Sequence, residues 1–177
     1  GFAYIPGTTG LFLNGVRIAS ADPAISGQTL TWAGLALPAP RAGSHYGMHT
    51  FVQDRCQEDY IRYQLDRARE LMGSGAYVKQ LFYGITTATA GPQACWVYFV
   101  NEAYNRGLIP VVRLQGVMSG GNWVKPPAAS PGDYSAIAAA YARVVSGLPR
   151  RDGIPLYVEV WNEPNLSSEW GERPVDV

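Results

Sequence analysis

A carboxylate and an amide stand side by side near the end of the chain, in the run Val160-Trp161-Asn162-Glu163-Pro164-Asn165. Glu163 can give or take a proton, and Asn162 offers both a hydrogen-bond donor and an acceptor. Pro164 lacks an N–H and fixes its own φ, so a strand cannot continue through it. Residues 154–160 are largely apolar and β-branched, which predicts a buried strand that ends where the motif begins. This pattern suits acid/base chemistry on a sugar, and a polar strand-end turn without chemistry is the alternative.

The segment from Leu156 to Asn165 resembles the acid/base signature of clan A glycoside hydrolases, most closely family thirty-nine, the β-xylosidase and α-L-iduronidase type. That signature has a glutamate four positions before the catalytic one, then Trp-Asn-Glu-Pro and Asn or Asp. Glu159 and residues 161–165 match it, whereas Leu156 stands where the family often has Trp and Val158 where it has Phe. The resemblance implies a retaining enzyme that cleaves O-glycosidic bonds by double displacement, with two carboxylates about 5 to 5.5 Å apart.

Four residues are expected to act on the sugar. By the resemblance, Glu163 is the general acid/base and Asn162 hydrogen-bonds the hydroxyl next to the reacting carbon. His49 ends or nearly ends the first predicted strand, where the resembling families place a polar residue that touches the sugar, and a structural histidine is the alternative. Trp123 follows the third predicted strand, where its ring could stack on a pyranose or pin its own loop.

Glu159 is expected to have a structural role. It has the same strand parity as Trp161 but lies deeper in the predicted strand. A carboxylate that points inward there needs a partner, and Arg113 on the third strand or Lys79 on the second could supply one. We therefore expect Glu159 to hold the interior together, and Trp161 to pack rather than bind sugar.

The segments that must position these residues alternate between short apolar runs and helical periodicity. The expected strands are residues 46–52, 77–85, 108–114 and 154–161, and the expected helices are residues 58–72, about 92–106 and about 133–146. This order predicts an α/β fold over residues 44–177, the N-terminal half (strands one to four) of a (β/α)8 TIM barrel. Residues 1–43 are predicted to be a short β-rich extension, because Asn14-Gly15 between apolar runs is typical of a hairpin and residues 28–37 suit another strand.

Four strands are too few for a barrel enzyme that works alone. A complete (β/α)8 barrel needs about 250 residues, and the resembling enzymes carry their nucleophile at the end of strand seven, which lies outside this chain. A homodimeric barrel is disfavoured, because the third strand ends in Arg113-Leu114-Gln115 and would present no carboxylate opposite Glu163. We expect the N-terminal part of a longer or nicked polypeptide, with the rest of the barrel as the same or a companion chain. The alternative is a non-catalytic glycan-binding or structural barrel protein that lacks the second carboxylate.

The composition limits the partners. The charges of 14 basic and 14 acidic side chains cancel, so the composition indicates neither nucleic acid nor an anionic membrane as a partner. It is compatible with a neutral polar ligand such as a carbohydrate. No apolar run approaches a membrane span, and no secretion signal is present. Because the chain starts at Gly1 without a methionine, we expect a processed or excerpted product of a secreted protein.

The sequence indicates neither a metal nor a cofactor. Ser119-Gly120-Gly121 is too short a glycine run to cradle a phosphate, and no helix start follows it. His45 and His49 are four residues apart but not on a helix, which disfavours a metal pair. Cys56 and Cys95 fall near two predicted helix starts, where one bridge is compatible with the pattern, but we favour two buried thiols.

Overall fold

The structure is a computed structural model that describes residues 46–52 and 56–171 with their side chains, and the backbone of five short strands within residues 2–31. The chain divides into two compact units, Gly1–Pro40 and Arg41–Val177. In the first unit β1 (Phe2–Tyr4), β2 (Leu11–Leu13) and β3 (Val16–Ala19) form an antiparallel sheet, and β4 (Ala24–Ser26) pairs with β5 (Thr29–Thr31). Strands β2 and β3 are those expected on either side of Asn14-Gly15; these two residues and residues 32–37 lie outside the described part of the chain.

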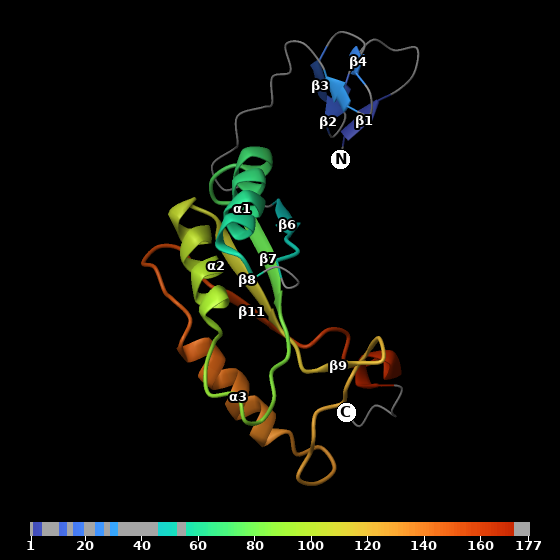
Figure 1. The fold of residues 1–177 in the computed structure, drawn as a ribbon, viewed down its shortest axis with the longest axis vertical. Coiled ribbons are helices and arrows are strands. Elements are labelled where there is room, and N and C mark those ends of the chain that lie inside the picture. Colours follow the sequence, from blue (N-terminus) through green and yellow to red (C-terminus); the bar gives the residue numbers. More distant parts are fainter. Residues whose placement is uncertain are drawn as a thin grey trace. The chain divides into compact units, whose positions relative to one another are not determined.

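The second unit is an α/β fold built on a parallel four-stranded sheet. Its elements are β6 (Gly47–His49), α1 (Glu58–Met72), β7 (Tyr77–Phe82), α2 (Ala94–Asn105), β8 (Ile109–Leu114), β9 (Met118–Ser119), β10 (Asn122–Trp123), α3 (Ser135–Ser146), β11 (Tyr157–Val160) and the 3-10 helix η1 (Ser167–Trp170). The order β11-β8-β7-β6 means that every new strand adds to the same edge, after one intervening helix (Figure 1). The predicted alternation of strands and helices is confirmed.

The observed strands are shorter than the predicted ones, for local reasons. The second predicted strand ends at Phe82 because Gly84 has a φ of 83° and turns its N–H to the carbonyl oxygen of Gly116. The fourth begins only at Tyr157, because Arg151 and Ile154 close a turn just before it through an isolated β-bridge. Helix α1 has the predicted bounds and ends at Gly73, whose N–H binds the carbonyl oxygen of Arg69.

The core lies on one face of the sheet. Burial alternates along β7 and β8, so one face is fully buried while the other face is half-exposed, as strand geometry requires. The buried face packs under α1, α2 and α3, which share one apolar cluster with it; Figure 1 shows α1 and α2 along the same side of the strands. Phe82 on β7 stacks on Trp96 of α2 at 4.7 Å between ring centres. The half-exposed face carries Tyr77, Lys79, Leu81, Ile109, Val111 and Arg113.

The two outer strands of the sheet are β6 and β11. On β11, Val158 is 38% exposed and Val160 is 60% exposed, and no described α-helix follows this strand to cover them. Exposed apolar edge strands are an aggregation hazard that proteins normally cover. Among the described residues, no helix has both the length and the apolar character needed to cross a membrane.

The prediction of two free thiols is wrong, because Cys56 and Cys95 form a disulfide. Cys56 lies just before α1 and Cys95 is the second residue of α2. Both helices follow neighbouring parallel strands, so their starts meet at the same end of the sheet, with a Cα–Cα distance of 5.7 Å that suits a bridge. The bond ties the loop after β6 to the first turn of α2.

Candidate functional site

The motif begins where β11 ends, at the carboxyl end of the sheet. The N–H of Trp161 still pairs with the carbonyl oxygen of Leu114 on β8, at 3.0 Å. Trp161 and Glu163 then have φ angles of 63° and 41°, the only left-handed non-glycine residues in the part of the chain described. This conformation is unfavourable for such residues and persists only when the surroundings hold it.

A stack of three aromatic rings holds the turn. Trp161 is buried, and its ring stacks on Trp170 of η1 at 5.1 Å between centres. Tyr134 stacks on Trp170 at 5.6 Å. The indole N–H of Trp161 donates to the carbonyl oxygen of Glu169 at 3.1 Å, and that of Trp170 donates to the carbonyl oxygen of Pro164. The expected packing role of Trp161 is confirmed, and Trp170, for which the sequence indicated no role, proves to share it.

Glu163 and Asn162 lie on the outer side of this turn. The Glu163 side chain is exposed and that of Asn162 is half-buried. The amide Nδ2 of Asn162 donates to Oε2 of Glu163 at 3.2 Å, so the two polar groups predicted to act on a sugar are adjacent. Within residues 46–52 and 56–171, no hydrogen bond or ion pair brings a second carboxylate against Glu163.

The half-exposed face of the sheet carries an ion cluster of Lys79, Arg113 and Glu159. Glu159 on β11 lies opposite Arg113 on β8 in the strand register, and its Oε1 accepts a hydrogen bond from the Arg113 Nε at 2.8 Å. Its Oε2 pairs with the Lys79 ammonium of β7. Both predicted partners of Glu159 are therefore confirmed. Burial by itself raises the pKa of Glu159, but hydrogen bonds and charges from its two partners outweigh this, so the pKa lies below its ordinary value.

His49 is the last residue of β6 and pairs in register with Lys79. Its ring stacks on Phe51 at 4.9 Å between centres. Partial burial lowers the pKa of His49 below its ordinary value, the charges of Arg113 and Lys79 lower it further, and Glu159 opposes the shift. The imidazole therefore stays neutral to lower pH than a free histidine and offers one donor and one acceptor. In the described part of the chain, neither a hydrogen bond nor an ion pair joins His49 to Glu163.

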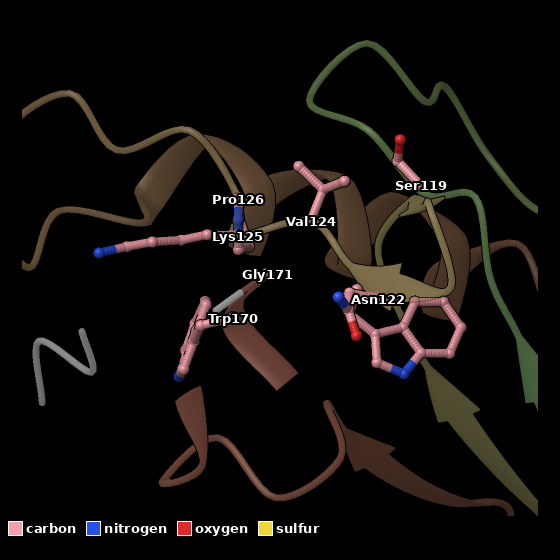
Figure 2. A pocket seen from close by; sticks show the side chains of 8 residues that line it. Ser119, Asn122, Val124, Lys125, Pro126, Trp170 and Gly171 are labelled. Carbon is pink, nitrogen blue, oxygen red and sulfur yellow. The ribbon is translucent and has the colours of Figure 1, made fainter. Parts of the chain in front are cut away.

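Trp123 lies in the short β9–β10 hairpin that follows β8. Its half-buried ring meets Tyr83 edge to face, at 6.0 Å between centres. Trp123 also lines a pocket of about 610 Å³ between the hairpin and η1; Figure 2 shows Asn122 and Trp170 on opposite sides of it. The pocket is lined by Ser119, Asn122, Trp123, Val124, Lys125, Pro126, Trp170 and Gly171.

Two aromatic residues at the same end of the sheet were missed by the sequence reasoning. Phe51 is 57% exposed two residues beyond β6, and Tyr83 is half-buried one residue beyond β7. Both lie near the carboxyl ends of the predicted strands 46–52 and 77–85, and their aromatic character at that position is the signal that could have found them, since the carboxyl ends of parallel strands meet at one edge. Among the described residues, no group of three or more His, Cys, Asp or Glu could hold a metal ion. No protein-family model, curated protein or solved structure matches this chain.

Proposed function

We propose that this chain is the N-terminal part of a retaining glycoside hydrolase, with Glu163 as the general acid/base. The observation that carries the proposal is the position of Glu163 and its bonded Asn162, one turn beyond the carboxyl end of the fourth parallel strand. The likeness of residues 156–165 to the clan A signature supports the same assignment.

The sheet supports a half-barrel as the scaffold. A doubly wound sheet reverses its strand order at a switch point and carries helices on both faces. Here every strand adds to the same edge, and the described helices pack on one face. The opposite face holds the ion cluster of Lys79, Arg113 and Glu159, which suits the interior of a closed barrel better than a layer covered by apolar helices.

The remaining strands would come from the rest of the polypeptide or from a companion chain. Such a partner would pair with the edges β6 and β11 and would cover the exposed Val158 and Val160. It would also bring the nucleophilic carboxylate to about 5 to 5.5 Å from Glu163. The disulfide between Cys56 and Cys95 supports a secreted protein, because such bonds persist mainly in oxidising compartments.

In this proposal the chain acts on a carbohydrate in two steps. In the first step Glu163 protonates the leaving oxygen while the partner carboxylate attacks the anomeric carbon. In the second step Glu163 removes a proton from the water molecule that attacks the glycosyl intermediate and releases the sugar. Asn162 hydrogen-bonds the neighbouring hydroxyl, and a neutral His49 can both donate to and accept from a sugar hydroxyl. The competing function is non-catalytic glycan binding, in which Asn162 and the residues around it bind a sugar without a second carboxylate.

The test is Glu163→Gln in the complete protein. With a glycoside whose leaving group is a poor one, we expect turnover to fall by about 10² to 10⁴-fold, the usual contribution of a general acid/base. Binding of the same glycoside should persist, because the amide has the same size as the carboxylate. With an activated aryl glycoside, added azide should restore turnover, because azide attacks the glycosyl intermediate without needing a general base.

Two results decide between the functions. If the Glu163→Gln protein turns over the glycoside with the poor leaving group as fast as the parent protein does, Glu163 is not the general acid/base. A parent protein that binds glycans but hydrolyses neither those glycans nor any of a panel of aryl glycosides would favour the binding function.

A further inference from the structure

The pocket between the β9–β10 hairpin and η1 has the size and lining of a ligand site. Its volume of about 610 Å³ lies within the range common for small-molecule pockets. Trp123, Val124 and Pro126 supply apolar surface, and Ser119, Asn122 and Lys125 supply polar groups. An aromatic ring beside amide and hydroxyl groups suits a sugar ring, which has apolar C–H faces and an edge of hydroxyls.

The walls of the pocket are preformed. The hairpin is closed by the pairs Asn122–Ser119 and Trp123–Met118 and by the hydrogen bond from the Val124 N–H to the Val117 carbonyl oxygen at 2.8 Å. On the opposite wall, Trp170 is held between the rings of Trp161 and Tyr134. A ligand would therefore meet surfaces that need little reordering, which favours binding.

A glycine brings the two walls together. Gly171 directly follows η1 with a φ of 63°, and a Cβ atom there would lie 2.9 Å from the carbonyl oxygen of Trp123. Any other residue would be strained by its backbone and would push the hairpin away. The approach of η1 to the hairpin thus depends on this glycine.

The same wall is bonded to the proposed catalytic turn. The indole N–H of Trp170 donates to the carbonyl oxygen of Pro164, the residue that follows Glu163. The pocket and the turn therefore share Trp170, and their geometry is set by one aromatic stack.

We propose that this pocket is a second sugar subsite, which binds a ring of an oligosaccharide next to the ring cleaved at Glu163. The proposal rests on the proposed function for the place of the cleaved ring, and it assigns Trp123 and Asn122 to the neighbouring ring. The substrate class is then an oligosaccharide or polysaccharide rather than a simple glycoside with a small leaving group.

The test measures binding of xylotetraose, cellotetraose and mannotetraose to the complete protein by titration calorimetry. The measurements use the Glu163→Gln background so that the probes are not consumed. We expect at least one tetrasaccharide to bind, and Trp123→Ala to weaken that binding by at least about tenfold, as loss of an aromatic platform does. Trp123→Phe should recover most of the affinity. Asn122→Ala, a change at an exposed side chain, should weaken binding with an unchanged melting temperature.

The matched control is Met118→Ala. Met118 is 47% exposed on the same hairpin and pairs with Trp123, but it does not line the pocket, so tetrasaccharide binding should be unchanged. Full-strength binding by both Trp123→Ala and Asn122→Ala would overturn the subsite, as would failure of all three tetrasaccharides to bind. The two proposals can fail separately. A Glu163→Gln protein with unchanged turnover would refute the acid/base role and leave the subsite standing if the Trp123 and Asn122 variants still lose tetrasaccharide binding. Full-strength binding by those variants would refute the subsite and leave the acid/base role standing.

Discussion

Gly116 is the position at which the packing around the proposed catalytic turn can be tested most directly. A Cβ atom at Gly116 would lie 2.8 Å from Cη2 and 3.0 Å from Cζ3 of Trp161. The Trp161 ring cannot easily move aside, because it stacks on Trp170 and donates to the carbonyl oxygen of Glu169. The φ of Gly116 is not in the left-handed region, so alanine would be strained only by this contact.

The expected magnitude follows from two opposing effects. Overpacking by one methyl group in a well-packed site costs about 1 to 3 kcal/mol. Replacing glycine by alanine also lowers the conformational entropy of the unfolded chain, which raises the free energy of unfolding by about 0.4 to 1 kcal/mol. We therefore expect Gly116→Ala to lower the free energy of unfolding by about 1 to 2 kcal/mol.

The assay is urea denaturation followed by circular dichroism, which does not depend on tryptophan fluorescence. Gly91→Ala is the matched control, because a Cβ atom at Gly91 has no neighbour within 4 Å and its φ is not left-handed either. We expect this control to be neutral or stabilising by less than about 1 kcal/mol.

A double-mutant cycle isolates the contact itself. Trp161→Phe removes the two ring atoms that the new methyl group would meet, so Gly116→Ala should cost almost nothing in that background. Equal costs of Gly116→Ala in the parent protein and in the Trp161→Phe background, or a Gly116→Ala protein as stable as the parent, would refute the packing argument.

The remaining predictions concern the disulfide and the ion cluster. Replacing Cys56 and Cys95 by serine should lower the free energy of unfolding by about 4 kcal/mol, the chain-entropy value for a sequence separation of 39 residues; an unchanged urea midpoint would contradict a formed bridge. Glu159→Gln should lower the pKa of His49 further, since this carboxylate is the group that raises it. NMR titration of the two histidines reads that pKa, and a rise would contradict the electrostatics. The pKa of Glu159 is lower in the folded protein than in the unfolded chain, so the ionised carboxylate stabilises the fold fully above the ordinary carboxyl pKa. This stabilisation is lost as pH falls through the folded pKa. Glu159→Gln should therefore reduce the loss of unfolding free energy that the parent protein shows on acidification.

The ion cluster could be predicted from the sequence, whereas the sequence left the disulfide as one of two alternatives and did not decide between them. Strand parity and parallel register place Lys79, Arg113 and Glu159 on one face of the sheet, and a carboxylate there needs a cationic partner. The pairing of Cys56 with Cys95 depends on the distance between the starts of two helices. That distance is set by how α1 and α2 pack, and sequence spacing contains no measure of it.

By itself, the sequence determined the alternation of strands and helices and the end of the fourth strand at Trp161-Asn162-Glu163-Pro164. These features are local, because hydrophobic period, strand parity and proline act within a few residues of the chain. Only the tertiary structure decided that Trp161 and Trp170 share a stack, that Gly116 leaves room for it, and that η1 meets the hairpin to form a pocket. The physical reason is that side-chain contacts between distant segments depend on close packing of the whole unit, where a single methyl group changes the result.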